Sequence, residues 1–125
     1  MTENDISFRI RAAIFKVYNK LGPGLFESVY EKALVYELTN DGLRVETQVG
    51  LPFTYETIKL DLGFRMDIVV EGLVVIEVKS VDVLAEIHHK QLLTYLVLSN
   101  KKLGILVNFN TAEIDKSIFR KVNGL

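Results

Sequence analysis

The sequence contains no cysteine in 125 residues, and this absence excludes disulfide bonds, zinc sites with cysteine ligands and thiol nucleophiles together. No segment at the N-terminus resembles a secretory signal, and charged residues interrupt every apolar run long before it could cross a bilayer. We therefore expect a soluble, cytoplasmic protein that does not enter a membrane.

An excess of charge of one sign is also missing. The chain has 15 Lys and Arg residues against 16 Asp and Glu residues, which gives a net charge of −1. Such a chain has no overall field that attracts a polyanion, and this counts against a generic nucleic-acid binder. The local basic pairs Lys101-Lys102 and Arg120-Lys121 are interpreted as solvated surface unless they flank a site.

The chain does have a high apolar content, 49%, over a length that suits one globular domain and is too short for two ordinary ones. No repeat, low-complexity tract or linker divides it, so residues 1–125 are expected to form a single domain. The apolar fraction would also suit a homodimer.

Periodicity predicts three helices. Apolar residues recur at three- to four-residue spacing from Ile6 to Leu21 and again from Phe26 to Leu38. The breaker Gly22-Pro23-Gly24 ends the first helix, and Asn40-Asp41-Gly42 ends the second. A third helix with a broad apolar face is predicted from about Asp82 to Asn100.

The strand signals follow the second helix. Val45 and Val49 alternate with polar residues and indicate a strand over 43–49, whereas Pro52 indicates an edge or a bend in the stretch 53–60.

The end of the chain predicts two more strands. The almost wholly apolar stretch Leu103–Phe109 follows a helix, as is typical of a crossover to a parallel strand that is covered on both faces. Residues 114–122 are predicted to form a last edge strand, with a short helix as the alternative. These elements together predict an α/β fold with a mixed central β-sheet flanked by helices.

Polar residues interrupt two apolar runs in the segment 64–80, FRMDIVVEGLVVIEVKS. Both runs are rich in Val and Ile and are separated by Glu71-Gly72, which indicates two antiparallel strands joined by a tight turn. One side-chain parity is wholly apolar and is expected to form the core face. It comprises Met66, Ile68, Val70, Val74, Ile76 and Val78. The opposite parity carries Asp67, Glu77 and Lys79.

The loop length determines whether these polar side chains meet. A two-residue turn would pair Asp67 with Ile76 and place a carboxylate among apolar side chains, which is costly for an unpaired charge. A three-residue loop ending at Gly72, with this glycine in the left-handed conformation of a G1 bulge, instead sets Asp67 opposite Val75 and diagonal to Glu77. Diagonal neighbours lie about 7–8 Å apart, a gap that two carboxylates can close around one divalent cation.

Lys79 lies two residues beyond Glu77 on the same face. Its ammonium group could orient or deprotonate a metal-bound water, or neutralise charge on a phosphate. A structural ion pair between Asp67 and Lys79 is the main alternative, but it leaves the charge of Glu77 unbalanced.

The pattern of an Asp, nine residues and then Glu77-Val78-Lys79 resembles the PD-(D/E)XK nuclease superfamily, and this is the only Glu-x-Lys in the chain. Gly24-x-x-Glu27-x-x-Tyr30 is similar to the signature of the small GxxExxY proteins assigned to that superfamily. Gln91-x-x-x-Tyr95 resembles the helix motif of its RecB-like branch. Met66, instead of a proline, precedes the Asp, at a position where the superfamily's pattern is tolerant. The resemblance spans nearly the whole chain and implies a restriction-endonuclease-like core.

The resemblance also implies a site and a reaction. Asp67 and Glu77 would ligate Mg²⁺ or Mn²⁺ with the backbone carbonyl of Val78 as a further ligand, and Glu27 would act on the metal or on the attacking water, directly or through water. Lys79 would complete a catalytic centre that hydrolyses phosphodiester bonds of DNA or RNA.

The third predicted helix would face this centre. Gln91 and Tyr95 lie one turn apart and would position the site or a nucleic-acid backbone. His88 is expected on the substrate side. Adjacent helical residues point about 100° apart, so His88 and His89 are not expected to share one ion.

Less specific interpretations remain open. Glu27 near a helix start is favourable for dipole reasons alone, and Tyr30 and Tyr95 on apolar stripes suit a core. The leading function is a metal-dependent nuclease. A catalytically silent nuclease-fold module for binding or assembly and a hydrolase of small phosphoesters are the alternatives, because fold alone does not choose among them.

Overall fold

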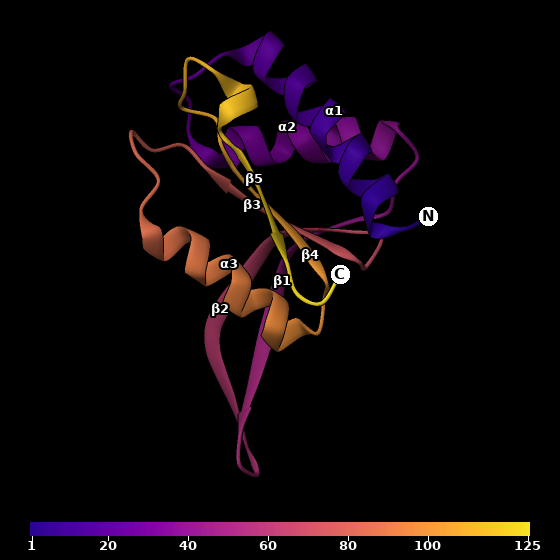
Figure 1. Ribbon diagram of the computed structural model, residues 1–125, viewed down its shortest axis with the longest axis vertical. Helices are drawn as coiled ribbons and strands as arrows, with labels where there is room; N and C mark the ends of the chain where they lie inside the picture. The colour runs from indigo at the N-terminus through magenta and orange to yellow at the C-terminus, as the bar shows by residue number, and fades with distance from the viewer.

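The computed structural model describes residues 1–51, 53–59 and 63–125. Within these residues, five strands form one mixed sheet in the order β1-β2-β3-β4-β5, and three helices flank it (Figure 1). The elements in chain order are α1 (Glu3–Leu21), α2 (Glu27–Asn40), β1 (Val45–Tyr55), β2 (Ile58–Val70), β3 (Val74–Lys79), α3 (Glu86–Ser99), β4 (Leu103–Asn108), the 3₁₀ turn η1 (Ile114–Lys116) and β5 (Ile118–Val122). The predicted α/β class with a mixed central sheet is confirmed.

The helices form two layers. Helices α1 and α2 pack on one face of the sheet and α3 packs on the other, so two apolar clusters lie on opposite sides of the central strands. All six residues of β4 are buried, because both of its faces are covered. Strand β4 runs parallel to β3 and is reached through α3, as predicted, while the other strand pairs are antiparallel.

Helix α1 ends where the sequence predicted, and its first turn is capped. The Thr2 hydroxyl accepts a hydrogen bond from the Asp5 N–H, and the Asp5 carboxylate accepts one from the Thr2 N–H. Gly22 and Gly42, just beyond α1 and α2, both adopt positive φ.

Helix α3 begins at Glu86, four residues later than predicted. The Asn108 side chain donates to the Val81 carbonyl at 2.9 Å and accepts from the Val81 N–H at 3.0 Å. Because both backbone groups of Val81 bond to Asn108, Val81 does not join the helix. Asn108 is 5% exposed and lies at the end of β4. Its long-range contact could not be read from the local periodicity around Asp82.

Strands β1 and β2 form a long two-stranded ribbon that extends beyond the rest of the sheet (Figure 1). Strand β1 is an edge strand, while the expectation for Pro52 itself lies outside the described residues. The register passes from Thr47↔Ile68 to Val49↔Met66 around Gln48, whose φ is 50°.

Met66 does not lie on the same face of the sheet as Ile68 and Val70, with which the alternation of side chains had grouped it. It packs in the cluster beside α3, whereas Ile68 and Val70 pack beneath α1 and α2. The prediction for Met66 was therefore wrong. The alternation of faces along β2 breaks between Met66 and Ile68, at the step where no pair between Gln48 and Asp67 joins β1 and β2.

The loop between β2 and β3 has three residues, 71–73, and Gly72 adopts a left-handed φ of 66°. The loop ends at Leu73 and not at Gly72 as predicted, since Val70 pairs with Val74. Glu71 is also left-handed, with φ 54°, and is fixed by two bonds to Arg44: its N–H donates to the Arg44 carbonyl and its carboxylate accepts from the Arg44 N–H.

This loop corrects the predicted register. Val75 pairs with Val69 instead of lying opposite Asp67. Since Ile68 pairs with Ile76, the next step of the register sets Asp67 level with Glu77. Side-chain parity is unchanged, because the shift is two residues.

None of the helices in the described part of the chain is both long and apolar enough to span a membrane.

The contact between β4 and α3 supplies a test of the packing. A Cβ added to Gly104 would lie 2.8 Å from Cδ1 of the buried Leu92, which is too close. We expect Gly104→Ala to lower the free energy of unfolding by about 1–3 kcal/mol, measured by urea denaturation.

A double-variant cycle gives the control. Leu92→Ala alone is expected to cost about 2–5 kcal/mol, and the combination with Gly104→Ala less than the sum, because the shorter side chain removes the clash. Additive losses would contradict the packing of Gly104 against Leu92.

Candidate functional site

The ladder of backbone hydrogen bonds between β2 and β3 ends at Ile68 and Ile76, and crossed bonds replace it. The Asp67 N–H donates to Oε2 of Glu77 at 2.8 Å, and the Val78 N–H donates to Oδ2 of Asp67 at 2.9 Å. Each carboxylate therefore binds the backbone of the opposite strand. The two side chains are fixed at the point where the strands part.

The carbonyl of Val78 faces the same gap. Lys79 accepts a hydrogen bond from the Phe109 N–H at 2.9 Å through its carbonyl, so its backbone groups point toward the β4 side. Successive residues of a strand direct their backbone groups to opposite neighbours. Val78 therefore directs its N–H and carbonyl toward β2, where Asp67 lies.

Glu27 reaches this region from the first turn of α2. Its Oε2 accepts a hydrogen bond from the Ser80 N–H at 3.0 Å, directly after β3, and the Ser80 hydroxyl donates to the Leu25 carbonyl at 2.6 Å. The carboxylate thus bonds to another element, and not to the N-terminus of its own helix. The start of α2 is tied to the end of β3.

Tyr30 is a core residue, as the less specific interpretation had it. Its ring is fully buried and stacks on Phe109 with centroids 4.3 Å apart. Its hydroxyl donates to the Gly22 carbonyl at 2.6 Å and accepts from the Leu25 N–H at 3.1 Å. Gly24 in this loop has φ 96°, which favours glycine. The residues of the predicted motif thus shape the loop that presents Glu27.

Burial and mutual repulsion act on the two central carboxylates. Glu77 is 5% exposed, and burial, with the nearby charge of Asp67 as the second cause, raises its pKa to about 8. Burial also raises the pKa of Asp67, against the hydrogen bond from Val78 and the charge of Lys79. The charge of the Lys79 ammonium lowers the pKa of both carboxyls. The geometry does not support the alternative of a structural ion pair: among the described residues, Lys79 makes no contact ion pair with Asp67.

Two further residues adjoin the carboxylates and were missed in the sequence. Nε2 of Gln48 donates to Oε1 of Glu31 at 2.9 Å. Gln48 also lowers the pKa of Asp67, against the larger effect of burial, which raises it. Burial, together with the charges of Asp67 and Glu27, raises the pKa of Glu31. The four-residue spacing of Glu27 and Glu31 was a usable signal, because it puts both on one helix face. Gln48 carried no signal, since its position depends on an irregular strand pairing.

Helix α3 contributes Tyr95 from the other layer. Tyr95 is 5% exposed and packs in the apolar cluster that contains Met66 and Val75. Burial, followed by the charges of Glu77 and Asp67, raises the pKa of its phenol. Gln91 lies one turn earlier and is half-buried. Within the described residues, its amide has no hydrogen-bond partner, and no contact connects it to the carboxylates that it was predicted to position.

The two histidines contact different parts of the protein. Nδ1 of His88 accepts a hydrogen bond from the Ala85 N–H at 3.1 Å at the start of α3. His89 instead packs edge-on against Phe119 of β5, with ring centroids 4.9 Å apart. The imidazoles serve different neighbours, in line with the expectation that they do not share an ion.

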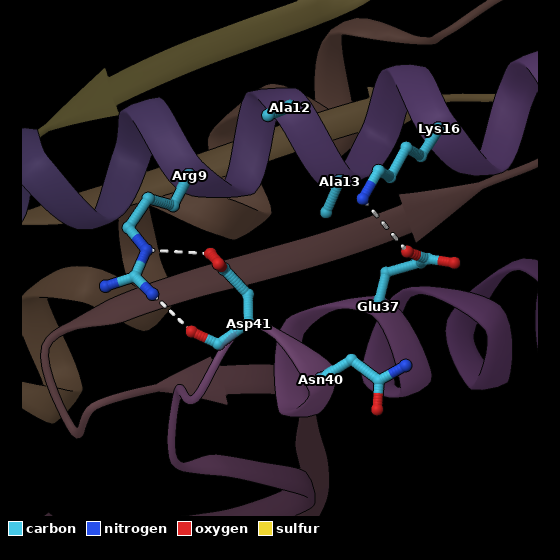
Figure 2. Close-up of a pocket in the computed structure, with 7 residues that line it drawn as sticks. All are labelled: Arg9, Ala12, Ala13, Lys16, Glu37, Asn40 and Asp41. Carbon is cyan, nitrogen blue, oxygen red and sulfur yellow. Dashed lines mark hydrogen bonds and ion pairs between the residues drawn. The ribbon is translucent and has the colours of Figure 1, made fainter.

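Figure 2 shows a pocket between α1 and α2 that is separate from these carboxylates. Its charges are paired across the helices: Nε of Arg9 donates to Oδ2 of Asp41 at 2.7 Å, and Nζ of Lys16 lies 3.8 Å from Glu37. Glu37 is ten residues along α2 from Glu27, about 15 Å at the rise of a helix. A second hollow does adjoin the site. Its lining is Ser28, Glu31, Lys32, Val35, Thr47 and Gln48.

No group of three or more His, Asp and Glu side chains in the described part of the chain is placed so that it could hold a metal ion. Two carboxylates and a main-chain carbonyl converge instead, with a lysine and a third carboxylate beside them. A mixed sheet of five strands with helices on both faces matches the fold of the restriction-endonuclease-like class of proteins.

A comparison with protein families agrees with this class. A family model described as the PD-(D/E)XK nuclease superfamily matches residues 4–121, and the chain belongs to this superfamily. PD-(D/E)XK nucleases generally use divalent metals and act on nucleic acids. The comparisons with curated proteins and with solved structures gave no match.

The loop before Glu27 depends on one hydroxyl, which can be removed alone. Tyr30→Phe keeps the stack on Phe109 but leaves Gly22 and Leu25 without their partner, and we expect it to lower the free energy of unfolding by about 1–3 kcal/mol. Tyr36→Phe, at a position on the same helix that is 63% exposed, is the matched control and should change nothing. Equal effects of the two variants in urea denaturation would contradict this role.

The raised pKa of Glu77 predicts a pH dependence of stability. In the unfolded chain this carboxyl releases its proton near its ordinary pKa of 4.5, whereas in the fold it keeps the proton up to about pH 8. Between these values the folded protein binds more protons, so the free energy of unfolding of the metal-free protein should fall as pH rises, by up to about 1.4 kcal/mol per pH unit.

Urea denaturation in EDTA, from about pH 5 to about pH 8, measures this slope. Glu77→Gln should reduce it, while Glu113→Gln, at an exposed carboxylate, should leave it unchanged. A wild-type protein whose stability rises over this window would overturn the assignment.

Proposed function

We propose that this protein is a metal-dependent nuclease that hydrolyses phosphodiester bonds of DNA or RNA through Asp67, Glu77 and Lys79, and that residues 1–125 form a single nuclease domain. The observation that carries the proposal is the pair of crossed bonds at the end of the β2–β3 ladder. These bonds fix two acidic side chains next to each other, within reach of one lysine.

The donor set suits a hard divalent cation. Asp67 and Glu77 each use one oxygen to accept a backbone N–H, and we assign their second oxygens to Mg²⁺ or Mn²⁺, with the Val78 carbonyl as a third oxygen ligand. Two carboxylates in a buried gap repel each other, and a cation between them would offset that repulsion. A bound cation would supply polarisation of the phosphate and activation of a water.

The remaining residues would act around this centre. The Lys79 ammonium would orient or deprotonate the attacking water, or neutralise charge on the phosphate. Glu27, held at Ser80, would act on that water or on the cation, directly or through a bridging water. Gln91 and Tyr95 would position the carboxylates or the substrate backbone from α3. His88, whose Nδ1 accepts a hydrogen bond at the start of α3, would lie on the substrate side.

We also infer that the chain belongs with the small GxxExxY proteins of the superfamily. Each residue of the motif has a physical reason here: Gly24 adopts positive φ, Glu27 binds the backbone after β3, and the Tyr30 hydroxyl holds the loop between them.

A silent nuclease-fold module for binding or assembly is the second candidate. The net charge of −1 favours it, because most proteins that grip a nucleic-acid backbone carry a basic surface. The same charge would suit a hydrolase of small phosphoesters.

Single substitutions at the centre test the nuclease. Asp67→Ala, Glu77→Ala and Lys79→Ala should each lower cleavage by at least about a hundredfold, measured with Mg²⁺ or Mn²⁺ on single-stranded, duplex, branched and RNA substrates. Calorimetry should show divalent-cation binding lost in the two carboxylate variants and kept in Lys79→Ala. Glu113→Ala is the control for a carboxylate at an exposed position.

Undiminished cleavage in the folded carboxylate variants would reject the assignment. A wild-type protein that binds the cation but cleaves no substrate of the panel would favour the binding module.

A further inference from the structure

An exposed aromatic side chain lies at the α2 side of the proposed centre. Phe26 is 83% exposed, although it begins an apolar stripe in the sequence. Its chain neighbours both bond to Ser80: the Leu25 carbonyl accepts from the Ser80 hydroxyl and the Glu27 carboxylate accepts from the Ser80 N–H. Phe26 is therefore held beside Ser80, the residue that directly follows Lys79 at the end of β3.

A second exposed aromatic lies at the α3 side. Phe64 of β2 is 41% exposed and precedes Asp67 by three residues. Its ring lies 6.1 Å from the Tyr95 ring at an interplanar angle of 52°. Tyr95 in turn packs in the same apolar cluster as Met66, which directly precedes Asp67. Phe26 thus directly precedes α2 on one side of the sheet, and Phe64 of β2 contacts α3 on the other side.

The small net charge of the chain argues against tight binding of a duplex. A protein that holds double-stranded nucleic acid neutralises several phosphates with Lys and Arg, whereas this chain has a net charge of −1. Proteins that hold single strands combine positive groups with aromatic rings on which the bases stack, so that stacking supplies affinity in addition to charge. Exposed aromatic rings beside a buried acidic centre suit the second kind of substrate.

We propose that the substrate of this centre is single-stranded nucleic acid, whose unpaired bases stack on Phe26 and Phe64 on either side of the phosphate that is cleaved. This inference rests on the proposed nuclease function, because it assumes that the phosphate is held between the two rings at Asp67 and Glu77.

Binding without cleavage isolates the stacking from the chemistry. The probe is a fluorescent oligonucleotide of about 20 nucleotides, as single-stranded DNA, as RNA of the same sequence and as blunt duplex, with anisotropy measured in EDTA on the full chain. The wild type should bind at least one of the single strands more tightly than the duplex, and the comparison of DNA with RNA identifies which. Phe26→Ala and Phe64→Ala should each weaken single-strand binding about tenfold, and Phe26→Trp should retain it.

Phe8→Ala is the matched control. Phe8 is 78% exposed on α1, one turn from Asn4, which accepts a hydrogen bond from Arg120 on the opposite edge strand β5. This variant should bind as the wild type does. Far-ultraviolet circular dichroism and thermal unfolding verify the fold of each variant.

Equal affinity for duplex and single strand, no binding of either, or equal behaviour of the Phe26, Phe64 and Phe8 variants would each overturn the inference. The proposed nuclease fails in a different way. Binding that depends on Phe26 and Phe64, without any cleavage in Mg²⁺ or Mn²⁺, would support the stacking surface and reject the nuclease. Cleavage without a preference for single strands would support the nuclease and reject the stacking surface.

Discussion

The structure around the proposed centre depends on the burial of a carboxylate, Glu77, between two covered faces of the sheet. A buried charge without partners is strongly unfavourable, so the surroundings must supply hydrogen bonds or a cation. The backbone supplies one bond, from the Asp67 N–H, and this bond is available only because the β2–β3 ladder stops one residue earlier. The end of the ladder and the acidic site are therefore one feature, and the rise in the pKa of Glu77 is its electrostatic consequence.

Two bonds between side chains and the backbone and one stack of aromatic rings then hold the neighbouring elements around this point. Glu27 ties the start of α2 to Ser80, Asn108 at the end of β4 holds Val81, and the stack of Tyr30 on Phe109 joins α2 to the segment after β4. These contacts keep the segment after β3 extended, which is why α3 starts late. They also fix the start of α2 and the segment that leads to α3 beside the end of β3.

The molecule combines a local acidic centre with an overall charge close to zero. A phosphodiester approaching Asp67 and Glu77 would be repelled unless a cation and Lys79 offset their charge. Because the rest of the surface provides no strong basic field, affinity for a substrate must come from contacts of another kind. Phe26, held beside Ser80, and Phe64, in contact with Tyr95, are the exposed rings that we propose for this role.

The sequence by itself determined the helices α1 and α2, the parallel strand β4 and the apolar side of the β2–β3 hairpin apart from Met66, because these features follow from short-range periodicity and burial. Parity also grouped Asp67, Glu77 and Lys79, and it survived the error in loop length because that error was an even number of residues. Tertiary structure alone decided the register, through the bonds of Glu71 to the backbone of Arg44, and it alone brought Gln48 and Asn108 to the site. Those contacts join residues that are distant in the chain. Local patterns of hydrophobicity do not indicate which distant backbone group a polar side chain will contact.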